Sequence, residues 1–363
     1  MRILVATDAW FPQVNGVVRT LTSLAKSLHG LGVEVAFLTP EGMRTVAMPS
    51  YPGIRVALPN PRKIAARIAA IAPDAVHIAT EGPIGLAVRR YCRRRGQPFT
   101  TSFHTRFADY VTARWPIPES LIWAWLRWFH NAGRGTMTAT ASLADELTGR
   151  GFTTVLRWPR GVDAELFRPR LDASLGLLRP IFLTVGRLAV EKNVAAFLAL
   201  DLPGTKVVVG EGPARDDLAR LCPKAIFLGA KQGEELARVY AAADVFVFPS
   251  RTDTFGLVLL EALACGTPVA GFPVAATRDV VGEAPVAMLD EDLRAACLGA
   301  LGLSRDACRG YAVTMSWDES ARAFLDNIQR VGVTTSAPLI LDALKAARDP
   351  ARSAGKAAAP AIG

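Results

Sequence analysis

The chain has 363 residues, half of them hydrophobic, which is enough for two α/β domains with a substantial core. No apolar run approaches the roughly 20 residues that a membrane-spanning helix needs, and the N-terminus leads directly into a strand-like run, so we expect neither a transmembrane segment nor a signal peptide. The five scattered cysteines form no C-x-x-C pair, which argues against a disulfide framework or structural zinc and favours a cytoplasmic protein.

The positive charge of the chain is concentrated in its first half. Residues 1–170 contain 22 Lys and Arg against 11 Asp and Glu, a net charge of +11, and the remainder, with 20 against 22, brings the total to +9. A basic half beside a nearly neutral half predicts an anionic partner. Because we recognise no nucleic-acid-binding motif, we expect no nucleic acid and instead an anionic membrane surface, with the protein held peripherally on its cytoplasmic side.

The first predicted strand covers residues 2–7 and is followed by a loop to Gly16 and a helix over 17–31. Asn15 and Gly16 at the end of the loop permit a positive φ, so that the backbone can approach a ligand closely, although a plain turn is the alternative. The loop lacks the G-x-G-x-x-G spacing of dinucleotide-binding turns, which argues against nicotinamide chemistry. A second strand is predicted over residues 33–39.

Two basic helices are predicted in this half, over residues 61–72 and 85–95, on either side of a buried strand at 76–78. His77 lies inside that strand, and we assign it no role. Clustered charges usually form a solvated face, but two basic helices without acidic balance also fit a membrane surface. The second helix ends in five arginines at positions 89, 90, 93, 94 and 95. The residues that we expect to face the membrane or the acceptor are Arg62, Lys63, Arg67, Arg90 and Arg94.

The strand predicted over residues 99–104 ends at His104, and parallel α/β sheets place functional groups at the carboxyl ends of their strands. We therefore treat His104 as a candidate catalytic residue, with a purely structural histidine as the alternative. Residues 107–129 contain four tryptophans and few charges, which fits either core beneath an acceptor site or a wedge in a membrane interface. Ser142 is expected to cap the following helix, with Asp145 and Glu146 in its first turn.

The second half of the chain restarts the alternation of strands and helices after a segment, 157–169, that is rich in Pro and Gly. A strand over residues 181–185 leads to Arg187 and Lys192 at a strand-to-helix junction. A guanidinium and an ammonium group there can hold a diphosphate, and a pair of surface cations is the alternative. Further strands are predicted over 206–209 and 226–229.

The stretch from residue 244 to 271 carries the most information. A buried strand at 244–248 precedes a polar loop and a helix over 256–265 that is apolar on nearly every side and yet contains Glu261. A buried carboxylate needs a partner, and Asp253 lies in the loop just before the helix, whose free N–H groups form an anion site. A ligand whose phosphate binds the backbone N–H groups and whose hydroxyls bind the two acids would be a sugar nucleotide. Alternatively, Glu261 pairs with a nearby arginine and Asp253 merely caps the helix.

This loop and helix resemble the E-x(7)-E motif of GT-B glycosyltransferases, specifically the retaining family 4, also called group 1. The first acid is Asp253 here, where the family has Glu, and the run T-D-T-F-G…L-L-E-A-L-A looks like the branch of GDP-mannose-dependent α-mannosyltransferases and glycolipid synthases. The resemblance covers roughly residues 1–330. It implies two Rossmann-like domains facing across a cleft: 1–170 for the acceptor and 171–332 for the nucleotide sugar, with a last helix at about 316–330 crossing back. Residues 333–363 are expected to form a disordered tail.

The resemblance also implies roles for individual residues. Asp253 would contact the hydroxyls of the donor sugar and Glu261 the ribose, while Arg187 and Lys192 would hold the diphosphate in a family-like G-R-L…E-K-N context. His104, in a family-like S-x-H-T context, would lie beside the donor sugar. The remaining expected donor contacts are Asn15, Gly16, Leu228, Lys231, Thr254, Phe255 and Gly256.

The activity implied is retaining transfer of a hexose, by best match from GDP-mannose, to a lipid or lipid-linked acceptor, without a metal or any cofactor beyond the nucleotide sugar. One alternative is a UDP-sugar-dependent diacylglycerol glucosyl- or glucuronosyltransferase. Others are a GT-B epimerase or phosphorylase, although we find no lysine site for the cofactor of a phosphorylase. From another class, the alternative is a non-catalytic sugar-nucleotide-binding protein. The sequence gives no indication of the oligomeric state.

Overall fold

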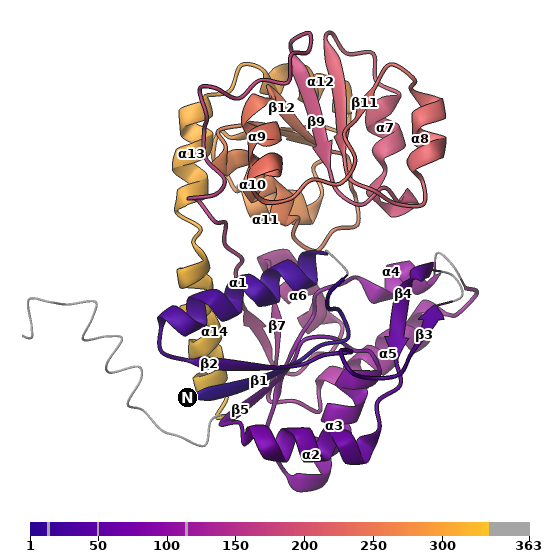
Figure 1. Ribbon diagram of the computed structural model, residues 1–363, viewed down its shortest axis with the longest axis vertical. Helices are drawn as coiled ribbons and strands as arrows, with labels where there is room; N and C mark the ends of the chain where they lie inside the picture. Colours follow the sequence, from indigo (N-terminus) through magenta and orange to yellow (C-terminus); the bar gives the residue numbers. More distant parts are fainter. Residues whose placement is uncertain (13–14, 49–50, 113–114, 334–363) are drawn as a thin grey trace, which may run out of the picture.

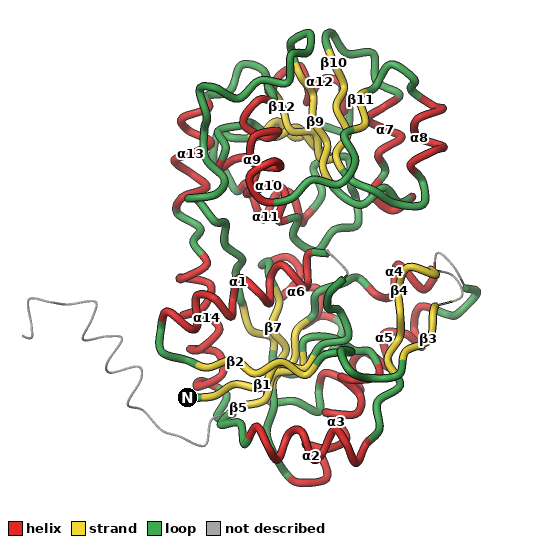
Figure 2. The backbone as a smooth tube through the Cα atoms, viewed as in Figure 1, coloured by secondary structure: helices red, strands yellow, loops and turns green. Residues whose placement is uncertain are grey.

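The computed structural model of the chain describes residues 1–12, 15–48, 51–112 and 115–333, and it contains two parallel six-stranded sheets, each flanked by helices (Figures 1 and 2). The expected tail therefore lies outside the described residues, apart from Val333. The strands of the first sheet end at Arg157 and those of the second begin at Ile181. On this ground we propose to keep the division into a first domain, 1–170, and a second domain, 171–332.

The first sheet has the strand order β2-β1-β5-β6-β7-β8. Its strands are β1 (Arg2–Ala6), β2 (Glu34–Leu38), β5 (Ala75–Ile78), β6 (Thr100–Ser102), β7 (Gly135–Thr138) and β8 (Val155–Arg157), and β3 (Thr45–Met48) and β4 (Tyr51–Ala57) form a separate antiparallel hairpin. The helices of this domain are α1 (Gly16–Gly30), α2 (Pro61–Ile71), α3 (Pro83–Arg95), α4 (Phe107–Thr112), α5 (Glu119–His130) and α6 (Ala141–Gly149).

The second sheet has the order β11-β10-β9-β12-β13-β14. Its strands are β9 (Ile181–Val185), β10 (Thr205–Val209), β11 (Ile226–Phe227), β12 (Val245–Phe248), β13 (Val269–Gly271) and β14 (Ala287–Leu289). The helical elements are the 3-10 turn η1 (Val190–Lys192), α7 (Val194–Leu198), α8 (Arg215–Leu221), α9 (Gly233–Ala242), α10 (Leu257–Ala264), α11 (Ala275–Val281), α12 (Leu293–Ala300), α13 (Arg305–Val313) and α14 (Trp317–Arg330).

Alternation of side chains along the central strands builds a core on each face of both sheets. In β1, Ile3 and Val5 enter one apolar cluster, whereas Leu4 and Ala6 enter another. In β12, Val245 and Val247 face one cluster while Phe246 and Phe248 face the other. Because the strands are buried on both faces, they read as continuous apolar runs in the sequence.

The order of the strands in the two sheets indicates where a ligand is expected to bind. Chain order reverses between β1 and β5 in the first sheet and between β9 and β12 in the second, and ligands of open α/β sheets bind outside the carboxyl ends of strands at such points. The loop before α1, the segment after β6, and the loops after β9 and β12 leave the sheets at those ends.

The last helix, α14, leaves the second domain and packs on the first. Its Phe324 and Ile328 lie in the same cluster as Ile3 and Leu21, and Ser316 caps the helix by accepting the Glu319 N–H at 3.1 Å. The two crossings of the chain between the domains touch, because Val162 forms a parallel bridge with Ser316. A Cβ on Gly161 would lie 2.3 Å from the Trp317 nitrogen, so only glycine fits this close approach.

Two local expectations are wrong. Thr140 rather than Ser142 caps α6, since its side chain accepts the Leu143 N–H and the helix already begins at Ala141. Gly16 does not need a positive φ, because it is the first residue of α1, and Asn15 caps that helix with φ −140° while its side chain accepts from Val17 and Val18.

Candidate functional site at the cleft between the domains

The loop between β12 and α10 forms the second-domain side of the site. Gly256 turns the chain into α10 with φ +82°, and a Cβ there would approach the Phe248 ring to 2.9 Å, so the tight entry requires glycine. The helix has no side-chain cap, so Asp253 does not play the capping role considered as the alternative. Phe255, also in this loop, packs against the domain core.

Glu261 lies on α10 with 4% of its surface exposed, and its carboxylate has two partners. Oε1 forms an ion pair with Arg19 of α1, and Oε2 accepts from the Tyr240 hydroxyl at 3.1 Å. Burial raises the pKa of Glu261 while Arg19 opposes the rise. The expectation that this carboxylate needs a partner is met by an arginine from the other domain.

Arg19 is a residue that sequence reasoning missed. It lies near the N-terminus of α1, where the helix dipole disfavours a cation, and its neighbours Val18, Thr20 and Leu21 are buried. A cation at the unfavourable end of a helix and beside buried positions was the signal that could have identified it. The ion pair with Glu261 therefore links the two domains at this point.

The loops after β9 and β12 are tied together around Lys192 and Asp253. These two side chains form an ion pair through Lys192 Nζ and Asp253 Oδ1, and the Asn193 side chain donates to the Pro249 carbonyl at 3.1 Å. Asp253 Oδ2 is enclosed and has no hydrogen-bond partner. Arg187 lies at the margin of this group, where its Nη2 is 3.6 Å from Glu191 Oε1.

The first domain contributes His104, just beyond the end of β6. The carbonyl oxygen of His104 accepts from the Thr254 hydroxyl at 2.7 Å, which places the residue against the Asp253 loop of the second domain. The ring Nδ1 is 3.4 Å from Arg160 Nη2, and Nε2 is enclosed without a partner. Burial, followed by the charge of Arg160, holds the pKa of His104 well below its ordinary value, so the ring is neutral at neutral pH.

A cavity of about 310 Å³ lies between the domains beside α10. Arg19 and Glu261 line it together with Lys231, whereas His104, Lys192 and Asp253 form the adjacent group around the Thr254 contact. Leu228 packs against the core of the second domain and does not line the cavity. The structure thus gathers Lys231 and Glu261 in one part of the cleft and His104, Lys192, Asp253 and Thr254 in another.

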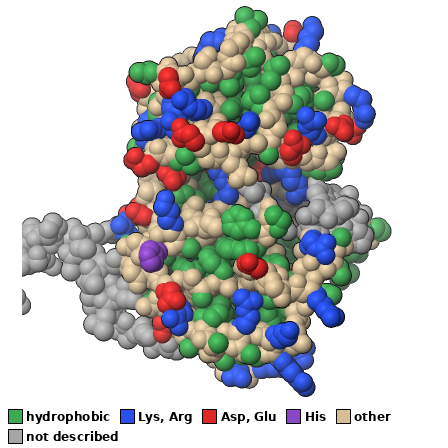
Figure 3. Space-filling view, viewed as in Figure 1, with side chains coloured by type: hydrophobic (Ala, Val, Ile, Leu, Met, Phe, Trp, Pro, Cys, Tyr) green, Lys and Arg blue, Asp and Glu red, His purple; other side chains and the backbone are tan. Residues whose placement is uncertain are grey.

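The five residues expected to face a membrane are all exposed. Arg62, Lys63, Arg67, Arg90 and Arg94 are exposed on α2 and α3, and Figure 3 shows Lys and Arg side chains gathered at the end of the molecule where Figure 1 labels these helices. Arg89, by contrast, is buried and donates to the carbonyls of Trp128 and Phe129, so it does not belong to the exposed cluster.

The tryptophan-rich segment divides between core and surface. Trp123 is buried in the core of the first domain, whereas Trp115 and Trp128 are 43% and 53% exposed. The segment is therefore neither entirely core, as one expectation had it, nor entirely exposed, as a membrane wedge would be. Part of it forms an apolar groove lined by Phe107, Val111, Trp115, Ile117, Leu121, Ile122 and Trp125.

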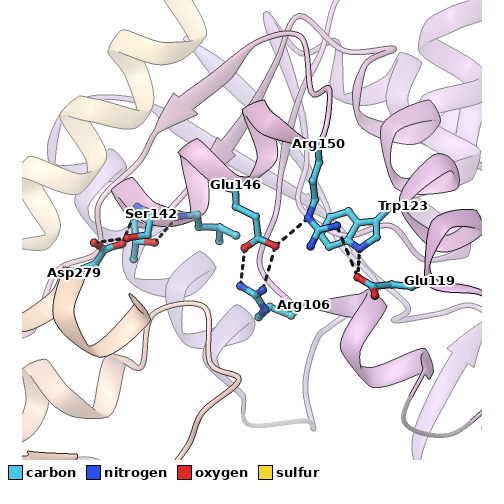
Figure 4. Close-up of polar contacts among 9 residues, drawn as sticks. Arg106, Glu119, Trp123, Ser142, Glu146, Arg150 and Asp279 are labelled. Atoms are coloured by element: carbon cyan, nitrogen blue, oxygen red, sulfur yellow. Dashed lines mark hydrogen bonds and ion pairs between the residues drawn. The ribbon is translucent and has the colours of Figure 1, made fainter. Parts of the chain in front are cut away.

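A polar network lies between this segment and α6 (Figure 4). Arg106 makes a two-pronged contact with Glu146, which also accepts from Arg150, and Arg150 approaches Glu119 to 3.7 Å. Glu146 therefore serves this network and not the first turn of α6, where it was expected. Across the described ranges, no three His, Cys, Asp or Glu side chains gather as a metal-binding group, and no described helix is long and apolar enough to cross a membrane.

Comparison with known proteins defines the class to which this fold and site belong. Over 97% of the chain, the structure matches sucrose-phosphate synthase from Thermosynechococcus elongatus, covering 99% of that chain with a TM-score of 0.67 at 19% identity, a likeness that shows the GT-B fold. The family model for Glycosyltransferase Family 4 matches residues 14–166, and the model for Glycosyl transferases group 1 matches 179–302.

The sequence relatives agree. The chain is 31% identical over 310 residues to a GDP-mannose-dependent alpha-mannosyltransferase of Mycobacterium tuberculosis, covering 77% of this chain and 81% of the relative. It is 29% identical over 310 residues to the alpha-monoglucosyldiacylglycerol synthase of Streptococcus pneumoniae, covering 74% and 70%. The chain belongs to the family 4, or group 1, glycosyltransferases of GT-B fold.

Proposed function

We propose that this glycosyltransferase moves a hexose, with retention, from a nucleoside diphosphate sugar to a lipid or lipid-linked acceptor. The part of this proposal that concerns the donor sugar is supported by two buried polar atoms near the Thr254–His104 contact that have no hydrogen-bond partner. Asp253 Oδ2 is an enclosed acceptor without a donor, and His104 Nε2 is an enclosed nitrogen without a partner. Buried polar atoms are nearly always paired, and a sugar hydroxyl both donates and accepts, so sugar hydroxyls suit this place.

Lys192 and Arg187 supply positive charge for the diphosphate. When the bond between sugar and phosphate breaks, negative charge develops on the leaving diphosphate, and cations already in place stabilise it. Lys192 now pairs with Asp253, so a bound diphosphate would share that ammonium group. We propose that these cations, together with the N-terminus of α10, perform the reaction without a metal or further cofactor. Transfer abolished by a chelator and restored by Mg²⁺ would contradict this part.

Glu261 and the cavity beside it suit the nucleoside. The cavity volume of about 310 Å³ is at the lower end of the range for small-molecule sites. Glu261 is the acid that can accept from ribose hydroxyls there, and Lys231 on the cavity wall is the candidate for the base. Because Arg19 occupies Glu261 Oε1, the donor would have to share or displace that contact.

GDP-mannose is our preferred donor because the mycobacterial relative carries that donor in its name. The pneumococcal relative, a glucosyldiacylglycerol synthase by name, supports a lipid acceptor and keeps a UDP-sugar-dependent lipid glucosyltransferase as the second candidate. For the acceptor side, the exposed cations of α2 and α3 and the apolar groove, both in the first domain, support work at an anionic membrane.

Thermal stabilisation by sugar nucleotides tests the donor. A ligand at a hundred times its dissociation constant adds about 2.7 kcal/mol to the stability of the folded state, so GDP-mannose should raise the melting temperature more than UDP-glucose or an ADP-sugar at equal concentration. Asp253→Ala should weaken the nucleotide sugar more than bare GDP, whereas Glu261→Ala should weaken both alike. A larger shift with UDP-glucose would favour the second candidate, and no shift with any sugar nucleotide would refute the proposal.

A further inference from the structure

Arg160 is a buried arginine at the point where the chain first crosses between the domains. It has 4% of its surface exposed and precedes Gly161 and Val162, which touch the second crossing. Its Nη1 donates to the Trp158 carbonyl at 2.6 Å, and its guanidinium carbon lies 4.0 Å from the centre of the Trp158 ring. Among the described residues no carboxylate lies within 4.0 Å of it, so a costly buried charge is retained without an ion-pair partner.

The remaining contact of Arg160 is with His104. Nη2 lies 3.4 Å from His104 Nδ1. A guanidinium group only donates hydrogen bonds, so the imidazole nitrogen facing it has to accept. A neutral imidazole that accepts at Nδ1 carries its proton at Nε2. The neighbour thus selects one of the two tautomers of His104.

The other groups that face His104 reinforce this state. Both ring nitrogens of His77 in β5 form hydrogen bonds, with the hydroxyls of Thr100 and Ser102. Both ring nitrogens of His130 in α5 do so as well, with Thr101 and Glu81, so neither ring competes for His104. Across the cleft stands the Lys192–Asp253 ion pair. The positive charge of Arg160 disfavours a second proton on His104, and burial lowers the pKa of Arg160 only to about 9, which leaves it charged at neutral pH.

We propose that Arg160 is a positioning residue that holds His104 as a neutral Nε2–H donor for a hydroxyl of the transferred sugar. The sugar part rests on the proposed function, whereas the tautomer part does not. In this role His104 donates a hydrogen bond and takes no proton from the substrate, because the lone pair of Nδ1 is engaged and Nε2 already carries hydrogen. The enclosed, unpartnered Nε2 beside the Asp253 loop is the donor that a sugar oxygen completes.

Nitrogen NMR of the uncomplexed protein tests the tautomer directly. The wild-type spectrum should show His104 with its proton on Nε2 down to low pH, the signal being assigned by its loss in His104→Gln. A proton on Nδ1, or a His104 that titrates near its ordinary pKa, would overturn the proposal, and this measurement needs neither a substrate nor a variant at position 160.

Variants at Arg160 separate the proposed role from packing. Arg160→Met removes the charge and the donors at similar length, so His104 should titrate at higher pH, and the acidic limb of the rate profile should move with it. Loss of one correctly held neutral hydrogen bond should lower kcat about tenfold and leave the KM for the donor within about twofold. Arg160→Lys keeps a charged donor and should restore part of kcat and of the low titration point.

Arg89→Met is the matched control. Arg89 is also buried, donates to backbone carbonyls and covers a tryptophan ring at 3.7 Å, but it lies between α3 and α5, away from His104. A loss of kcat in both Met variants with an unmoved His104 titration would show that Arg160 only packs. If the NMR result holds but no sugar nucleotide binds the wild type, the proposed function fails and the tautomer assignment survives.

Discussion

Lys192 and Asp253 form an ion pair in the cleft, so replacing either residue removes this contact from the other. Their side chains are only 27% and 17% exposed, so the pair is shielded more than a surface salt bridge. The same ammonium group is the one that we assign to the diphosphate. Its contribution should therefore be seen in the reaction rate more than in folding.

Lys192→Ala tests this assignment. Removing one charged contact that is strongest in the transition state costs on the order of 3 kcal/mol, so turnover should fall about a hundredfold, and Arg187→Ala should lower it as well. Steady-state rates and thermal unfolding would be measured together. Arg220→Ala, which removes a cation from an exposed pair with Asp217, is the control and should change neither. A folded Lys192→Ala protein with near wild-type turnover would contradict the role of this lysine.

Residues of the site differ in how well the sequence predicts them. The buried acid of α10 and the cations after β9 stand out because charges at those positions conflict with their apolar surroundings or with the turn that they occupy. Tyr240 and Arg160 do not stand out in this way, because their importance comes from partners 21 and 56 residues away in the chain. Arg19 has an unusual place for a cation, near the N-terminus of α1, but its partner lies 242 residues away. The functions of His104, Asp253 and Glu261 stay predictions.

At the scale of elements, α6 and α11 form a polar contact between the two domains. The N–H and hydroxyl of Ser142 both donate to the carboxylate of Asp279, at 2.9 Å each, across 137 residues of sequence (Figure 4). An acid from the other domain thus sits at the N-terminus of α6, where the helix dipole favours negative charge. Ser142 is expected to cap its own helix from the sequence, but it binds the neighbouring domain instead.

Asp279→Ala should loosen this contact. We expect small-angle scattering to show a larger radius of gyration and the donor to bind more weakly, because the Thr254–His104 contact would form less often. Asp292→Ala is the control, since Asp292 caps α12 entirely within the second domain and should affect stability alone. Unchanged scattering and donor affinity in Asp279→Ala would show that the contact does not hold the domains.

The central strands follow from the sequence because parallel strands buried on both faces leave apolar runs, as in β1 and β12, whereas helices such as α5, α9 and α12 are not located individually by it. Caps are harder, because Thr140 and Ser142 offer the same hydroxyl chemistry two residues apart. The way that the domains face each other is predicted only through the family resemblance. No local pattern encodes a contact such as Ser142–Asp279, which depends on how the two sheets are placed relative to each other.

At the scale of the whole molecule, charge is separated between the domains. The exposed cations on α2 and α3 lie in the half with a net charge of +11, whereas the second half is slightly negative. Near an anionic surface each basic residue contributes about 1 kcal/mol, so we predict that the cluster holds the protein at such a membrane. The apolar groove would add a contribution that salt does not screen.

Sedimentation with vesicles tests this. Binding to anionic vesicles should exceed binding to neutral ones and should weaken near 1 M salt, where screening acts over about 3 Å. Replacing Arg62, Lys63 and Arg67 by Gln should weaken it, whereas replacing the second-domain Arg215, Arg220 and Arg238 should not. Any binding that survives high salt should be lost in Leu121→Ser, which changes an exposed residue of the groove. Equal binding to both kinds of vesicle would refute the electrostatic part.

The chain passes twice between the domains, and the two passages meet at the bridge between Val162 and Ser316. We predict that the domains turn about this point. Because both crossings pass through this bridge, a rotation of one half relative to the other would have its centre there. Gly161, Val162 and Trp317 at the pivot also line the cavity beside Glu261. A rotation would therefore displace this part of the cleft least, and the Asp253 and His104 sides would separate further. For a nucleoside bound beside Glu261, as we propose, we predict that this end stays bound while the sugar end opens, so that product exchange does not begin with release of the whole nucleotide.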